Sequence, residues 1–120
     1  MQYLLMIYNE EEIWANLAKG EQEDLYKQYT AFNADCGGSI RGANRLQPTS
    51  VATTVRVRDE KTLTTDGPFA ETKEQLGGYF LVEAANLDEA VAIAAKIPGA
   101  RHGSIEVRPI WAIGAAQGGR

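Results

Sequence analysis

The sequence predicts an α+β domain of ferredoxin-like type, in which a mainly antiparallel sheet carries two main helices on one face. Three observations lead to this prediction. Residues 2–8 and 79–84 are short apolar runs typical of buried strands. Residues 21–36 and 87–97 carry apolar side chains at helical spacing. The expected order is strand, helix, strand, strand, a short extended piece, strand, helix and strand, so an extra β element is inserted in the ferredoxin-like pattern.

The chain begins with a strand and two helical segments. Residues 2–8 are apolar on both faces, which indicates a central buried strand. Asn9 is expected to cap a short helix, because Glu12 follows three residues later as in a capping box. Gly20 then separates this segment from the main helix over residues 21–36. One face of that helix is apolar at spacings of four, three and four, formed by Leu25, Tyr29, Phe32 and Cys36.

The middle of the chain is expected to be extended. The glycine pair at 37–38 ends the helix, and residues 39–46 predict a weak strand. Residues 51–58 alternate valine or threonine with polar side chains, as a strand does. Residues 59–61 form a polar turn, and a short extended piece over 62–65 follows.

The last third repeats the strand and helix pattern. After the apolar strand over 79–84, Asn86 is expected to cap a helix and Glu89 to complete its capping box. Residues 104–111 form the last strand, and Pro109 places its end at a sheet edge. The buried stripe of the helix is predicted to be Leu87, Ala90, Val91, Ala94 and Ile97.

Composition limits the domain count and the class of partner. The length suits a single domain, here residues 1–113, followed by a flexible C-terminal tail over 114–120. The net charge is −4 and lysine and arginine are dispersed, which argues against nucleic acid as a partner. No apolar run approaches the roughly 20 residues that span a bilayer, so no membrane partner is expected. A single cysteine cannot form an internal disulfide, which favours the cytoplasm.

The number of helices predicts a second copy of the chain. Two main helices cover only one face of a four- or five-stranded sheet, yet the strands over 2–8 and 79–84 are apolar on both faces. The remaining chain is too short to cover the other face. We therefore predict a homodimer in which two sheets meet face to face.

The stretch over 65–80 combines backbone-shaping residues and charge more densely than any other part of the chain. Asp66 precedes Gly67, as in an Asx turn whose carboxylate accepts backbone N–H groups while the glycine supplies a positive φ. The same rigid turn would also present the Asp66 carboxylate at a cleft as a general base. We expect structural turns, with Phe69 as an apolar anchor, from Gly67, Pro68, Phe69, Gly77 and Gly78.

Side chains near this stretch are further candidates. Glu71 is a candidate acid or base and Lys73 a candidate contact for a small anionic ligand, although a solvated loop would carry the same charges. Tyr79 suits the core, an interface or a pocket. Arg108 and Glu106 share one face of the last strand, and Arg108 is expected either to form a cross-strand ion pair or to bind a carboxylate through two hydrogen bonds. The candidate catalytic residues are thus Asp66, Glu71 and Tyr79, and the candidate substrate-binding residues are Lys73 and Arg108.

No cofactor or metal is expected. The single histidine, His102, and the single cysteine, Cys36, are too few for a zinc site, and the carboxylates match no metal-binding loop. His102 suits a surface loop and Cys36 suits the core.

The run Thr-Asp-Gly-Pro-Phe-Ala-Glu-Thr-Lys-Glu-Gln-Leu-Gly-Gly-Tyr at residues 65–79 resembles the signature of the DGPF proteins, within the YCII-related family. The similarity extends to residues 3–8, 52–56 and 103–109. The resemblance implies a dimeric α+β barrel, in agreement with the homodimer predicted above.

The resemblance implies less about activity. The wider family resembles lactone-processing enzymes, including a chloromuconolactone dehalogenase, for which a His-Asp pair has been suggested. The histidine of that pair belongs on the first helix, and residues 21–36 contain none. We therefore expect small-molecule binding, with an acid–base enzyme acting on a small carboxylate or lactone as one form of it. The alternative is a non-enzymatic regulatory or interaction module, because DGPF relatives are often encoded beside extracytoplasmic-function sigma factors.

Overall fold

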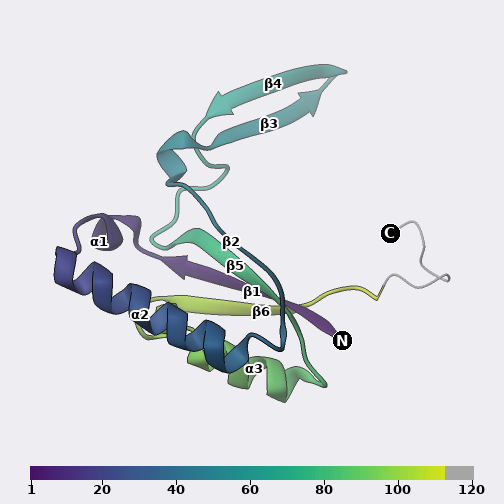
Figure 1. The fold of residues 1–120 in the computed structure, drawn as a ribbon. Coiled ribbons are helices and arrows are strands. Elements are labelled where there is room, and N and C mark those ends of the chain that lie inside the picture. The colour runs from purple at the N-terminus through teal and green to yellow at the C-terminus, as the bar shows by residue number, and fades with distance from the viewer. Residues whose placement is uncertain (113–120) are drawn as a thin grey trace.

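The computed structural model of the protein describes residues 1–112, so the tail predicted over 114–120 lies outside the described residues. Figure 1 shows an α+β domain with a separate two-stranded hairpin. No helix in the described part is long and apolar enough to cross a membrane. The elements, in chain order, are β1 (Gln2–Asn9), α1 (Glu11–Ala15), α2 (Lys19–Cys36), β2 (Ile40–Arg45), the 3-10 turn η1 (Thr49–Val51), β3 (Thr53–Arg58), β4 (Lys61–Asp66), β5 (Gln75–Glu83), α3 (Leu87–Lys96), the 3-10 turn η2 (Pro98–Arg101) and β6 (Ser104–Pro109).

The main sheet has four strands in the order β2-β5-β1-β6, and each pair of neighbours is antiparallel. With α2 and α3 in the connections, this is the predicted ferredoxin-like order. β1 and β5 occupy the centre because their residues are apolar on both faces. β6 is an edge strand, which confirms the position expected from Pro109, a residue that has no N–H to donate to a neighbouring strand.

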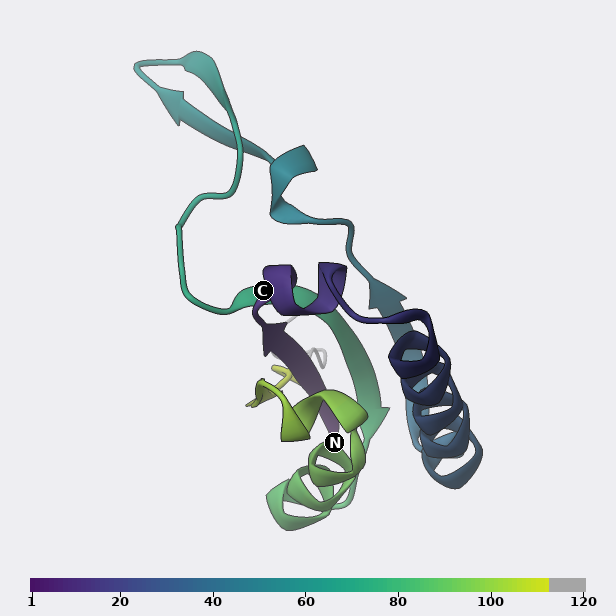
Figure 2. The same ribbon diagram turned by 90° about the vertical axis from the view of Figure 1, so that its left-hand side faces the viewer.

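The core lies between the sheet and the helices. Figure 2 shows α2 and α3 on the same side of the sheet, as predicted. Alternate residues of the central strands point toward them, and Leu5 and Val82 have no exposed surface. The Phe32 ring of α2 packs edge-on against Phe80, with 5.0 Å between ring centroids. Each such buried side chain contributes about 1.5–3 kcal/mol through the apolar surface it removes from water.

The two N-terminal helices begin at residues other than those predicted. Asn9 does not cap α1, because it is the last residue of β1 and pairs with Gln75 of β5. α2 begins at Lys19, so Gly20 lies in its first turn. The Glu21 carboxylate accepts a hydrogen bond from the Ala18 N–H at 3.2 Å, which stabilises this earlier start. The predicted inner face of α2 is confirmed, since its four apolar residues are the least exposed of the helix.

The predicted Asn86 cap of α3 forms, but the described residues show no return hydrogen bond from Glu89 to complete the capping box, and the buried stripe is rotated. The Asn86 side chain accepts a hydrogen bond from the Glu89 N–H at 2.9 Å. Ala90, Ala94 and Ile97 are buried together with Ile93, which the prediction omitted. Leu87 and Val91, by contrast, are 51% and 49% exposed, so this part of the prediction was wrong. The buried side chains repeat at three and four residues, and Val91 lies off that face.

β5 begins at Gln75, so Gly77 and Gly78 belong to a strand, and the turn predicted for them was wrong. The pairing of β1 with β5 shifts by one residue here, which makes Gly77 the extra residue of a β-bulge. A Cβ atom on Gly78 would lie 2.8 Å from the Asn44 carbonyl oxygen of β2. Glycine therefore permits β2 to approach β5 closely.

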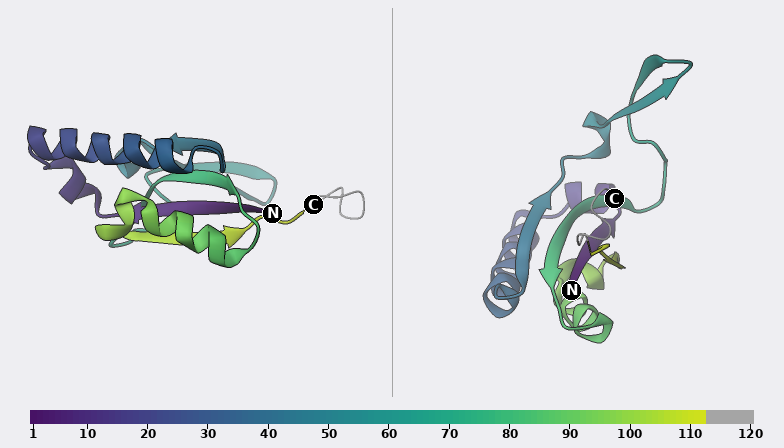
Figure 3. Two further views of the ribbon diagram at one scale, coloured as in Figure 1. Left: turned by 60° about the horizontal axis from the view of Figure 1, so that its bottom comes forward. Right: turned by 90° about the vertical axis from the view of Figure 1, so that its right-hand side faces the viewer.

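The inserted β element is a hairpin that does not join the main sheet. β3 and β4 pair from Thr53 with Asp66 to Arg58 with Lys61. The predicted strand over 51–58 begins at Thr53 because η1 precedes it. Asp59 and Glu60 form its turn with φ angles of 51° and 65°, the left-handed conformation that a two-residue hairpin loop of type I′ requires. Figure 3 shows the hairpin extending away from the sheet and helices.

Candidate functional site

The side of the sheet that faces away from α2 and α3 has no cover in the described residues. We call it the open face. Register places Leu4 beside Leu81 and Arg108, and Met6 beside Tyr79 and Glu106, all on this side. Its central side chains are half-buried by one another, and Met6 is 9% exposed. The open face therefore has partly buried apolar side chains at its centre, a hydrogen bond between Asn44 and Tyr79 on its β2 side, and charge along the β6 edge.

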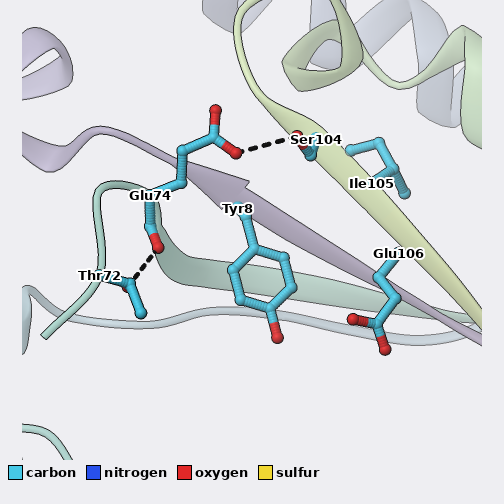
Figure 4. Close-up of a pocket in the computed structure, with 6 residues that line it drawn as sticks. All are labelled: Tyr8, Thr72, Glu74, Ser104, Ile105 and Glu106. Carbon is cyan, nitrogen blue, oxygen red and sulfur yellow. Dashed lines mark hydrogen bonds between the residues drawn. The ribbon is translucent and has the colours of Figure 1, made fainter. Parts of the chain in front are cut away.

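A shallow hollow of about 450 Å³ lies at one end of the open face. It is formed where β1 and β6 meet the segment that leads into β5. Figure 4 shows the phenol of Tyr8 and the carboxylate of Glu106 directed toward the same side of the sheet. The residues that line the hollow are Tyr8, Thr72, Glu74, Ser104, Ile105 and Glu106.

Hydrogen bonds hold the loop side of the hollow in place. The Ser104 hydroxyl donates to the Glu74 carboxylate at 2.9 Å, which joins the loop to β6. The Thr72 hydroxyl donates to the Glu74 carbonyl oxygen at 2.5 Å. The Glu11 N–H donates to the Gln75 side-chain oxygen at 3.0 Å, which joins α1 to the start of β5. Both walls of the hollow are thus connected to regular secondary structure.

The sequence stretch over 65–80 is divided between two parts of the molecule. Asp66 is the last residue of β4 and lies in the hairpin, whereas Tyr79 lies within β5. Glu71 is an exposed loop residue. The candidate catalytic residues therefore come from three separate places, and none of them lines the hollow.

The candidate binding residues lie closer to the hollow. Arg108 forms an ion pair with Glu106, two residues away on the same strand, and not the cross-strand pair that was one expectation for it. This pair brings a guanidinium next to a carboxylate that lines the hollow. Lys73 lies between Thr72 and Glu74 in the chain, but its ammonium is directed to Glu10, 3.8 Å away, and is largely exposed.

The turn at Asp66 is held by other groups than those predicted. Gly67 has a φ of 100°, which confirms the predicted positive angle. Its N–H donates to the Ala52 carbonyl oxygen at 2.7 Å, and its own carbonyl oxygen accepts from the Thr54 hydroxyl at 2.9 Å. Within residues 1–112 the Asp66 carboxylate accepts no hydrogen bond, so the predicted Asx turn was wrong. The backbone of Ala52, which directly precedes β3, and the side chain of Thr54 in β3 fix the turn instead.

Phe69 is not the apolar anchor that the sequence predicted. Its side chain is 78% exposed. The Arg56 guanidinium lies over its ring, 5.3 Å from the centroid, in a cation–π contact. Phe69 therefore packs against the hairpin and not into the core of the same chain.

Tyr8, Glu74, Ser104 and Glu106 are the residues that sequence reasoning missed or did not place in a site. Period-two alternation along 2–8 could have indicated that Tyr8 lies on the face opposite to Leu5 and Ile7. Nothing in the sequence alone brings Glu74 next to Ser104, because their contact depends on the sheet order.

The described residues contain no group of three or more side chains suited to hold a metal ion. His102 is exposed, as predicted, and Cys36 is buried. Burial raises the pKa of Tyr29, and the Gly99 backbone and Arg45 lower it to a lesser extent. Tyr29 lies on the helix side of the sheet, so this perturbed group is not part of the hollow.

The comparisons with known proteins agree with the motif over 65–79. The family model of the YCII-related domain matches residues 1–113. An uncharacterised protein of Rhizobium meliloti (strain 1021) is 39% identical over 114 residues, which make up 92% of each chain. The match thus covers the sheet, the helices and the hairpin together.

Proposed function

This chain belongs to the YCII-related domain family, and from that premise we propose that it is a small-molecule-binding homodimer of the cytoplasm. In this proposal the open faces of two copies meet and form a dimeric α+β barrel. The hollow beside Tyr8 and Glu106 becomes the ligand site, enclosed between the copies.

The structure of the open face supports the dimer. The described chain has one sheet layer and one helix layer, and its smallest extent is 18 Å. Leu4, Met6 and Leu81 are apolar side chains at the centre of the uncovered layer. Large apolar patches on a protein surface are typical of interaction sites. A second copy covers this face with an identical apolar surface, as a two-fold interface requires.

One observation carries the proposed chemistry, namely that the Tyr8 phenol and the Glu106 carboxylate point to the same side of one hollow, with the Arg108 guanidinium paired to Glu106. Arg108 suits the binding of a ligand carboxylate through paired hydrogen bonds. Glu106 and Tyr8 are placed to take up and give back a proton. These groups suit acid–base chemistry on a small carboxylate or a lactone. Glu74, already bonded to Ser104, positions the loop that closes the hollow.

The test is binding of a panel of small carboxylates and lactones, measured by calorimetry. Glu106→Gln and Tyr8→Phe keep the size of each side chain and remove its proton-transfer group. We expect each to weaken binding of a recognised compound by roughly 10- to 100-fold, since hydrogen bonds to charged groups contribute about 1.5–3 kcal/mol. Glu23→Gln, on the exposed side of α2, is the matched control and leaves binding unchanged. Absence of saturable binding across the panel would contradict the proposal.

The second candidate function is a regulatory module that binds another protein. The exposure of Phe69 favours it, because an aromatic ring that is 78% exposed on a loop is suited to dock into a partner. A photo-crosslinking residue placed at position 69 in cells tests this candidate. A single reproducible foreign partner would support it, whereas crosslinks to the same chain alone would exclude it.

A further inference from the structure

The hairpin formed by β3 and β4 is a regular element that the rest of residues 1–112 leaves largely uncovered. All six residues of β4 are exposed, and neither strand pairs with the main sheet. An isolated two-stranded hairpin is marginally stable in water. A projecting hairpin with a well-defined register therefore needs a surface to pack against.

The two faces of the hairpin differ in character. Thr54, Arg56 and Leu63 share the face that contacts the loop at Gly67 and Phe69. The other face, which we call the bare face, is uncharged apart from Asp66 at its base. It is formed by Thr53, Val55, Val57, Thr62, Thr64 and Asp66.

The bare face is made of the residue types that pack well. Val55 and Val57 are 59% and 58% exposed. Five of its six residues are β-branched, and such side chains form flat, stiff surfaces on a pleated sheet. Charged side chains would protect such a surface from association, but those of β3 lie on the opposite face at Arg56 and Arg58. The bare face therefore has the composition of an interface.

The position of the hairpin identifies the second copy as its occupant. Figures 2 and 3 show the hairpin leaning toward the side of the sheet opposite to the helices, beyond the end of the strands. This is the side on which a second copy sits when two open faces meet. A hairpin in that place reaches past the end of its own sheet and alongside the body of the partner.

The area of contact points to the same occupant. The open face has four strands about 4.8 Å apart and about six residues long, which gives roughly 400 Å² per copy. A stable interface buries about 800 Å² on each partner, so the sheets alone fall short. One face of the two-stranded hairpin adds roughly 200 Å². In a two-fold dimer each copy both extends an arm and receives one, which brings the total to about 800 Å² per copy.

From these observations we propose that the hairpin is an arm whose bare face, centred on Val55 and Val57, packs against the body of a second copy. The arm of the second copy packs against the first in the same way. This inference rests on the proposed dimer. It adds that the arms, and not the open faces alone, hold the dimer together.

The first test uses the wild-type protein and amide hydrogen exchange at two concentrations, one below and one above the dimer dissociation constant. We expect strands β1 and β5 and the hairpin over 53–66 to become more protected together as the dimer forms. Protection of the sheet without any change in the hairpin would overturn the arm while leaving the dimer intact. Hairpin protection that is the same at both concentrations would also overturn it, because the arm would then be packed on its own chain.

The second test changes the bare face. Val55→Asp with Val57→Asp places two carboxylates on each arm, and we expect the dimer dissociation constant to rise by at least roughly 100-fold. Val55→Thr with Val57→Thr keeps the β-branched shape, so the hairpin still forms, and we expect a rise of roughly 10-fold. Val91→Asp is the matched control, because Val91 is 49% exposed on α3, and it leaves dimerisation unchanged.

The outcomes separate the two proposals. A wild-type protein that is monomeric at every concentration overturns the dimer and the arm together. A wild-type dimer whose dissociation constant is the same with either double substitution overturns the arm alone. A dimer weakened by both double substitutions and not by the control supports the arm.

Discussion

The main sheet and the hairpin are both built from regular antiparallel pairs, yet they differ in what holds them. In the sheet, Leu5 and Val82 are fully buried against α2 and α3, so packing within the chain stabilises the pairing. In the hairpin, Val55 and Val57 remain more than half exposed, and the two-residue turn, the cross-strand pairs and the contacts with the loop at Gly67 and Phe69 hold the strands. A segment can therefore have a well-defined local conformation without packing on a hydrophobic core. Local contacts set the conformation of the hairpin without burying it in a core.

The largest expected effect compares one apolar side chain from each region. Leu5→Ala removes a fully buried side chain and should lower the free energy of unfolding by about 2–5 kcal/mol. Val55→Ala should change it by less than about 0.5 kcal/mol at concentrations where the monomer dominates. Urea denaturation followed by circular dichroism measures both. Similar losses from the two substitutions would contradict the difference between sheet and hairpin.

The next effect concerns the close approach of β2 to β5. Gly78→Ala would place a Cβ atom 2.8 Å from the Asn44 carbonyl oxygen, and we expect a loss of about 1–3 kcal/mol. The matched control is Gly38→Ala, because a Cβ atom there meets no atom within 4 Å and the φ angle of Gly38 is not positive. This control should be neutral or stabilising by up to about 1 kcal/mol. Thermal melts of the two variants distinguish these outcomes.

Two substitutions in the β3–β4 turn should stabilise the hairpin without changing the stability of the main sheet. Asp59 and Glu60 have positive φ angles, which non-glycine residues adopt at a cost of roughly 1–2 kcal/mol each, less for Asp. Asp59→Asn with Glu60→Gly supplies the pair that a type I′ turn favours. Hydrogen exchange of the hairpin amides should slow by roughly 2- to 5-fold, since local opening becomes less favourable by up to about 1 kcal/mol. An equal gain in global unfolding free energy would show that the hairpin and the sheet unfold as one unit.

At high pH, the free energy of unfolding depends in part on Tyr29, which lies on the helix side of the sheet. Burial raises the pKa of Tyr29 above its ordinary value of 10.0, so the folded state favours the neutral phenol. Its contribution to stability is complete below that ordinary value and is lost as the pH rises through the folded-state pKa. Urea midpoints between about pH 9 and about pH 11.5 should fall less steeply in Tyr29→Phe than in the wild type. Tyr26→Phe, at a 76% exposed position, should leave the slope unchanged.

The smallest expected effect is at the residue that the sequence made most prominent. The Asp66 carboxylate accepts no hydrogen bond in the described part of the chain, and its neighbour Gly67 is held by Ala52 and Thr54. Asp66→Ala should therefore change the melting temperature of the monomer by less than about 2 °C. A fall of about 4–8 °C would restore the structural turn that the sequence suggested.

Much of the fold could be predicted from the sequence because local patterns determine it. The apolar runs over 2–8 and 79–84 became the two central strands, and the cap at Asn86 formed as expected. The predicted end of β1 and the predicted start of β5 were wrong, because a tertiary contact outweighed the local sequence pattern at each. Asn9 stays in β1 because it pairs with Gln75, and Gly78 lies in a strand because β2 approaches it closely.

The candidate site was less accessible to sequence reasoning. The motif over 65–79 is continuous in the chain, but Asp66 ends the hairpin and Tyr79 lies in the main sheet. The hollow instead combines Tyr8, Glu74 and Glu106 from three distant segments. Such a combination depends on the strand order β5-β1-β6, which places β1 between the other two. A motif identifies a family more readily than it identifies the residues that share a site.

Sedimentation velocity of the wild-type protein over a wide concentration range measures the dimer itself. We expect a reversible equilibrium between the 13.1 kDa chain and a species of twice that mass. That dimer should be lost in Val55→Asp/Val57→Asp and retained in Val91→Asp. A single species at the mass of one chain, up to the highest concentration reached, would contradict the account.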